Sequence, residues 1–136
     1  MSDTDLKAFI QQFEDAYNRK DLEAVAALYA ENAYRQIPDG TNHSREQIKE
    51  SFAQNFQNWP DLHITFDPVF PQGDVVTVRL HAKGTHSQSI AGEPPTGKTI
   101  EFTGISIFRV ENGQSVESWS EWDRMPIMQQ IGLIKT

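Results

Sequence analysis

Residues 74–86 read Asp-Val-Val-Thr-Val-Arg-Leu-His-Ala-Lys-Gly-Thr-His, and within this run apolar and polar side chains alternate. Successive side chains of a β-strand point to opposite faces of the sheet. The even positions from Val76 to His86 therefore form one mainly apolar face, whereas Arg79 and Lys83 lie on the other face. The alternation predicts a strand with one face in a core, and it places His86 on that inner face.

Further strands are predicted after Pro60, where the chain becomes rich in Val, Ile, Thr and Phe. Short connections containing Gly, Asn and Asp separate two of the strand pairs, so these neighbours should pair antiparallel. A longer connection at 87–97 contains two prolines and two glycines and is expected to be a loop. The expected strands occupy residues 63–70, 74–86, 98–111 and 114–123.

The chain before Pro60 is mainly helical in pattern. Apolar residues recur every three or four positions from Leu6 to Tyr17, which predicts a long amphipathic helix. Asp21 is a suitable N-cap for a second helix, and Ser44 begins a capping box for a third. Helices followed by strands indicate an α+β fold with one curved antiparallel sheet and helices against one face. A short strand at 34–37 and a short helix at 126–130 complete the expected elements.

Composition limits the classes of function. The 136 residues form one expected domain, 1–136, and 12 basic against 19 acidic residues give a net charge of −7. Without a Lys/Arg-rich run, a nucleic-acid partner is not expected. No apolar run or secretion signal is evident, so we expect a cytoplasmic protein with no membrane partner. There is no cysteine, and the four histidines lack the spacing of a metal site, so we expect no metal.

The last predicted strand leaves two orientations open. Trp119, Glu121 and Asp123 share one face, whereas Trp122 lies on the other. If Trp119 faces inward, both carboxylates enter an apolar cavity. Burial and like charge would then raise at least one pKa, and that group could exchange a proton near neutral pH. In the alternative, this face is solvated and Trp122 is the buried residue.

The strand at 98–111 carries bulky apolar groups on both faces. Ile105 and Ile107 lie on the face that helices are not expected to cover. An apolar patch on an uncovered sheet face is typical of an interface between subunits. We therefore expect a homodimer formed through the outer face of the sheet.

Two early segments, 17–22 and 27–32, resemble the opening helices of the nuclear transport factor 2-like superfamily, the cystatin-like α+β cone. Five later segments, 84–86, 92–98, 104–109, 119–123 and 129–132, resemble its SnoaL-like polyketide cyclase branch. The resemblance covers nearly the whole chain and rests on the order and spacing of motifs that are individually weak. It implies a cone-shaped, curved antiparallel sheet of four to six strands around a long N-terminal helix, with two further helices, an apolar pocket and usually a homodimer.

By this resemblance the protein is a cofactor-free enzyme that performs acid/base chemistry, such as an aldol-type cyclisation, on a small and mostly apolar carbonyl compound. The aspartate that ends the last strand, Asp123, would be the general acid/base. His86 and Glu121 would assist it, with His86 as a possible donor to an enolate oxygen. The other interpretation of His86 is that it holds the 87–97 loop through backbone hydrogen bonds.

The chain also departs from its relatives. Phe13, Ile37 and Ser106 stand where a ketosteroid isomerase would carry its tyrosine and two aspartates, so isomerase activity is disfavoured. Many cyclase-like members have His-Asp before the proline, where this chain has Gln36-Ile37. The alternative function is therefore a non-catalytic module that binds a small molecule or only dimerises. The expected substrate-binding residues are Phe13, Tyr17, Phe56, Trp59, Phe102, Ser106 and Trp119.

Overall fold

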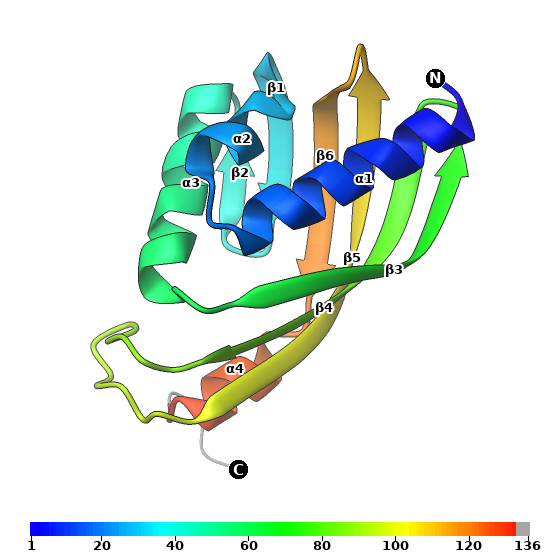
Figure 1. The fold of residues 1–136 in the computed structure, drawn as a ribbon. Coiled ribbons are helices and arrows are strands. Elements are labelled where there is room, and N and C mark those ends of the chain that lie inside the picture. Colours follow the sequence, from blue (N-terminus) through cyan, green and yellow to red (C-terminus); the bar gives the residue numbers. More distant parts are fainter. Residues whose placement is uncertain (133–136) are drawn as a thin grey trace.

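One bent sheet and four helices form the described part of the chain, residues 1–132 of the computed structural model (Figure 1). The last four residues of the expected domain 1–136 lie outside it. The α+β architecture with a long N-terminal helix confirms the expected fold class. The helices are α1 (Asp3–Asn18), α2 (Leu22–Ala27), α3 (Arg45–Asn58) and α4 (Met125–Gln130).

Two helices begin where the capping residues predict, α2 after Asp21 and α3 after Ser44, whereas α1 begins at Asp3, before the first apolar position of its predicted pattern. Ser2 caps α1, because its hydroxyl accepts a hydrogen bond from the Asp5 amide and Asp5 accepts one from the Ser2 amide. Asp21 caps α2 through the Ala24 amide, and Ser44 caps α3 through the Gln47 amide. These bonds satisfy backbone donors that no helical carbonyl can reach.

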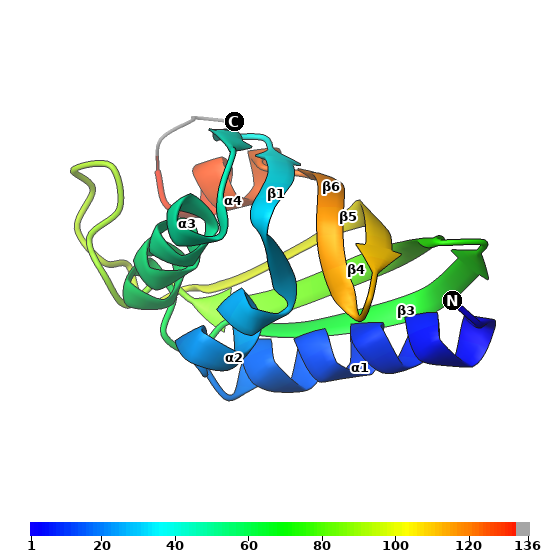
Figure 2. The same cartoon turned by 90° about the horizontal axis from the view of Figure 1, so that it is seen from above.

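The six strands lie in the order β2-β1-β6-β5-β4-β3. All neighbours pair antiparallel except β1 and β6, which are parallel. Helices α1, α2 and α3 lie on the concave side of the bent sheet, and α4 lies beside one end of β5 (Figures 1 and 2). The strands are β1 (Tyr29–Ile37), β2 (Gly40–Asn42), β3 (His63–Gln72), β4 (Val75–Thr85), β5 (Thr99–Glu111) and β6 (Gln114–Trp122).

The core lies between α1 and the concave face of the sheet. The even positions of β4 are buried, as the alternation in its sequence predicts. The ring of Phe13 in α1 is at the centre, with its centroid 5.5 Å from that of Phe108 and 5.7 Å from that of Phe66. Phe52 and Tyr29 complete this aromatic cluster at 5.9 and 6.2 Å. Their packing fixes the distance between α1, α3 and the sheet.

Three features of the sheet differ from the expectation, and the first is the parallel pairing of β1 with β6, since an antiparallel sheet was expected. Strand β1 begins at Tyr29, whereas a helix was expected to continue to that residue, and β2 was not expected. Tyr29 is 1% exposed and pairs with Ser115 of β6, so the chain joins the sheet as soon as α2 ends. This pairing joins segments that are distant in sequence, and it outweighs the local helical pattern.

Every helix within residues 1–132 is too short or too polar to span a bilayer.

Candidate active site

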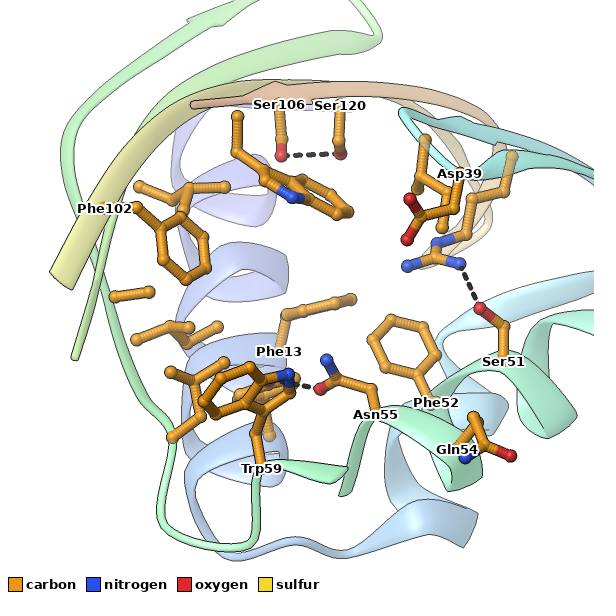
Figure 3. A pocket seen from close by; sticks show the side chains of 18 of the residues that line it. Phe13, Asp39, Ser51, Phe52, Gln54, Asn55, Trp59, Phe102, Ser106 and Ser120 are labelled. Carbon is orange, nitrogen blue, oxygen red and sulfur yellow. Dashed lines mark hydrogen bonds between the residues drawn. The ribbon is translucent and has the colours of Figure 1, made fainter. Parts of the chain in front are cut away.

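A cavity of about 390 Å³ lies between α1, α3 and the concave face of the sheet (Figure 3). Aromatic and aliphatic side chains form the larger part of its wall, and polar or charged side chains form the rest. Size and lining are typical of a site for a small molecule. The polar or charged wall residues are Tyr17, Tyr29, Arg35, Asp39, Ser51, Gln54, Asn55, Asn58, Ser106 and Ser120.

Most of the predicted substrate-binding residues lie on this wall. The two that do not are Phe56 and Trp119. Phe56 packs behind the wall, with its ring centroid 5.2 Å from that of Tyr17. Trp119 is on the other face of the sheet, where its ring lies 6.2 Å from that of Tyr34. The predicted residues on the wall are Phe13, Tyr17, Trp59, Phe102 and Ser106.

The last strand, β6, turns the face that carries its carboxylates away from the cavity. Ser120 and Trp122 line the cavity, and the hydroxyls of Ser120 and Ser106 are hydrogen bonded at 2.7 Å (Figure 3). Glu121 is exposed on the convex face. The register explains this, because Ser120 pairs with Ser106 and Trp122 with Gly104, which lie on the inner face of β5. The inward orientation expected for Glu121 is therefore wrong, and the alternative with Trp122 inside is the observed one.

Asp123 follows β6 and is exposed as well, which corrects its expected position inside the cavity. Its carboxylate accepts a hydrogen bond of 3.1 Å from the Met125 amide, and its own amide donates to the Thr103 carbonyl. These bonds hold the turn between β6 and α4. Asp123 is therefore engaged in shaping a turn on the surface.

His86 is completely buried, but it does not line the cavity. Its Nδ1 accepts a hydrogen bond of 3.2 Å from the Thr96 amide and lies 2.9 Å from the Thr96 hydroxyl. Its backbone also bonds Gly97 and Lys98, and its ring lies 5.8 Å from that of Trp59, which does reach the cavity. This arrangement matches the interpretation in which His86 holds the 87–97 loop.

Arg35 lies on the wall but is not among the expected substrate-binding residues. It is 8% exposed and belongs to β1. Its Nη1 donates to Asn42 Oδ1 at 3.2 Å and to Ser51 Oγ at 3.1 Å, and the guanidinium carbon lies 4.4 Å from the centre of the Phe52 ring. Burial lowers the pKa of Arg35, while Tyr29 acts against this shift. An arginine nonetheless remains protonated at neutral pH.

Asp39 is the only carboxylate on the cavity wall among the residues that the structure describes. It lies in the Pro38-Asp39-Gly40 turn between β1 and β2, at the exposed rim. Its Oδ1 is 2.8 Å from Nη1 of Arg124, which follows β6. The cavity therefore has a carboxylate that is open to water on one side and reaches the cavity on the other.

Tyr17 and Asn55 form a second polar pair on the wall. The Tyr17 hydroxyl donates to Asn55 Oδ1 at 2.5 Å. Burial raises the pKa of Tyr17, so the hydroxyl stays protonated and can donate. Because the Asn55 oxygen is occupied, the amide NH₂ group is the part of this side chain that can donate to a ligand.

The curved sheet, the long N-terminal helix and the cavity place the protein among the cone-shaped α+β folds. Comparison with known families identifies it further: the profile of the SnoaL-like polyketide cyclase family matches residues 7–131. The chain therefore belongs to the SnoaL-like polyketide cyclase family. A search of curated proteins found no match.

Solved structures agree with this assignment. IdmH from Streptomyces antibioticus, a candidate polyketide cyclase, is 31% identical, with a TM-score of 0.84 over 93% of this chain and 97% of that chain. AclR from Streptomyces galilaeus, a candidate hydroxylase, is 21% identical, with a TM-score of 0.89 over 99% and 85% of the two chains. A Catenulispora acidiphila protein with a ketosteroid isomerase-like fold, in complex with trimethylamine, is 19% identical, with a TM-score of 0.78 over 91% and 92%. The last two show similarity of fold alone.

Within residues 1–132, no group of three or more His, Asp or Glu side chains is arranged to hold a metal ion.

Proposed function

We propose that the protein is a cofactor-free enzyme that moves a proton at the carbon next to a carbonyl, as in an aldol-type ring closure of a small, mostly apolar substrate. One observation carries this proposal: a carboxylate, Asp39, and two hydrogen-bond donors, Arg35 and Asn55, reach the same mainly apolar cavity. Family membership and the likeness to a candidate polyketide cyclase support it.

In this proposal Asp39 is the proton acceptor. Its carboxylate removes a proton from the carbon next to the substrate carbonyl, and the electrons of the C–H bond form an enolate. The enolate carbon attacks a second carbonyl carbon of the same molecule, which forms a C–C bond and an alkoxide. The alkoxide then takes the proton back from Asp39, so the carboxylate is regenerated. No oxidant or reductant is consumed.

Asn55 would stabilise the oxygen on which negative charge develops, and Arg35 would bind the substrate. A fixed N–H donor in a site that excludes water is worth far more than one in bulk solvent. Asn55 is suited to this role because its bond with Tyr17 fixes the orientation of its amide. The aromatic side chains of Phe13, Trp59 and Phe102 would hold the flexible substrate in a folded form, which lowers the entropic cost of ring closure.

The test compares two aspartates. Deuterium exchange at the carbon between the carbonyls of aryl 1,3-diketones would be followed by NMR, together with ring closure of aryl diketo esters. Asp39→Asn should lower the rate by about 10²- to 10⁴-fold, the usual contribution of a general acid or base. Asp123→Asn should react at close to the wild-type rate, because this residue shapes a turn outside the cavity. A slow Asp123→Asn variant together with an Asp39→Asn variant at the wild-type rate would instead assign the acid/base role to Asp123.

A second candidate function is a binding module without catalysis. It is favoured by the ion pair between Asp39 and Arg124 at the rim, which already engages the wall carboxylate, and by Ile37 at the family's acidic position. In that case the probes would bind in the cavity, but wild-type protein would neither exchange nor cyclise any of them.

A further inference from the structure

The two charged residues of the cavity wall differ in their ion pairing. Among the residues that the structure describes, Arg35 and Asp39 are the charged side chains on this wall. Asp39 has its own counter-ion, because Arg124 lies 2.8 Å away. Arg35 has no carboxylate within 4.0 Å in residues 1–132. The wall therefore carries one positive charge without an ionic partner.

The hydrogen-bond partners of Arg35 are neutral, and Asp39, whose charge acts on Arg35 from beyond 4.0 Å, is already paired with Arg124. Asn42 and Ser51 accept hydrogen bonds from one guanidinium nitrogen, and the face of Phe52 lies against the guanidinium plane. These contacts support the side chain, but they supply no negative charge. A buried cation is costly unless an anion or solvent compensates it. A neutral ligand that displaced water from the cavity would remove the solvent and leave the charge uncompensated.

We propose that the cavity takes its ligand as a monoanion, with a carboxylate paired to Arg35 and an apolar body against the rest of the wall. A guanidinium presents parallel donors that match the two oxygens of a carboxylate. The apolar body would extend from the side of Ser51 and Phe52 toward Phe102 and Trp59, which line the opposite part of the cavity (Figure 3).

This inference rests on the proposed function only in placing the ligand in the same cavity. It gives the two donors different roles. Asn55 donates to the carbonyl that reacts, and Arg35 pairs with a negative charge that the substrate carries before it reacts. An interaction made equally in the bound substrate and in the transition state lowers KM and leaves kcat unchanged. Once a substrate is known, Arg35→Gln should therefore raise KM and change kcat little.

Binding can be tested without turnover, using 2-naphthoate and 2-naphthamide as probes. They share the same rings and differ in the negative charge. Binding would be followed by calorimetry and by the fluorescence of Trp59 and Trp122, which line the cavity. The variants are Arg35→Gln and Arg35→Lys. Arg19→Gln is the matched control, because it removes the same charge from an exposed site at the end of α1.

Wild type should bind naphthoate at least about tenfold more tightly than naphthamide, a difference of about 1.4 kcal/mol. Arg35→Gln should abolish this preference, Arg35→Lys should keep part of it, and Arg19→Gln should keep all of it. Should Arg35→Gln fail to fold, the wild-type and Arg35→Lys data decide.

Equal binding of the two probes by wild type, no binding of naphthoate, or a preference that survives in folded Arg35→Gln would overturn the inference. A preference for naphthoate in a protein that catalyses no exchange would uphold it and count against the proposed enzyme instead.

Discussion

Replacing Gly104 with alanine tests how closely β5 and β6 pack behind the cavity. A Cβ atom at this position would lie 2.4 Å from the Glu121 carbonyl oxygen, 2.7 Å from Trp122 Cβ and 2.9 Å from Trp122 Cα. Ordinary contacts begin near 3.4 Å, so the closest atom would have to move by 3.4 − 2.4 = 1.0 Å. These atoms belong to the backbone of a paired strand or are attached directly to it, so no side-chain rotation relieves the clash.

Overpacking of this kind costs about 1–3 kcal/mol, and we expect the upper part of that range. For a chain of this length, 1 kcal/mol corresponds to roughly 3–5 °C in Tm, so Gly104→Ala should lower Tm by about 6–15 °C. Thermal unfolding followed by circular dichroism would measure this. Trp122 fluorescence should change as well, because the wall of the cavity moves.

Gly84→Ala is the matched comparison. Its closest contact, at 2.9 Å, is the end of the Leu62 side chain, which can rotate, although Leu62 Cα is 3.1 Å away. This substitution should cost less, about 1 kcal/mol. A Gly104→Ala protein as stable as wild type, or more stable than Gly84→Ala, would refute the packing argument.

Three further predictions concern the surface, the loop and acid stability. If a homodimer forms through the convex face, where Ile105 is 46% exposed, Ile105→Lys should give monomers in analytical ultracentrifugation; a monomeric wild type would contradict this proposal. Thr96→Val removes the hydroxyl beside His86 Nδ1, so amide exchange in the 87–97 loop should accelerate with little change in Tm; unchanged exchange would argue against a loop-holding histidine. Bonding to the Thr85 amide lowers the pKa of Asp61 in the folded state. The contribution of Asp61 to stability is therefore present above its unfolded pKa of about 3.9 and is lost as the pH falls through the lower folded pKa. In urea unfolding, the wild type should have a higher free energy of unfolding than Asp61→Asn at pH about 7, and this difference should disappear in strong acid. A difference that does not change with pH would contradict the prediction.

Local patterns predicted most of the fold. The spacing of apolar residues in α1, the capping residues Ser44 and Asp21, and the alternation in β4 all depend on neighbours in sequence, and the structure has them as expected. The parallel pairing of β1 with β6 was not predictable in this way, because it depends on contacts between residues that lie far apart in sequence.

The orientation of β6 was not predictable from its own residues. Each face carries one tryptophan, and the inner face also carries Ser118 and Ser120, whose polarity is typical of an exposed surface. Of the two, Ser120 lines the cavity, where its small side chain leaves room for a ligand. The orientation depends on pairing with β5, and the pattern of one strand does not contain that information.

The inward position of Arg35 can be inferred from the pattern of its own strand. Ala33, Arg35 and Ile37 occupy alternating positions of one strand, so an inward alanine and isoleucine imply an inward arginine. The alternation in β1 indicates a buried cation in the same way as the alternation in β4 indicates a buried face. What the sequence could not supply is the lack of a carboxylate beside it, since that depends on how β1, β2 and α3 pack.

The parallel contact between β1 and β6 also bears on how the protein is made. β1 ends at Ile37 and β6 begins at Gln114, an interval of 114 − 37 = 77 residues. At about 5–20 residues per second, a ribosome needs roughly 4–15 s to cover that interval. Throughout this time the nascent chain exposes a strand edge that can pair with other chains. Arg35 and Trp122 meet across the finished cavity only after synthesis is almost complete, so a bound ligand cannot assist the earlier stages of folding.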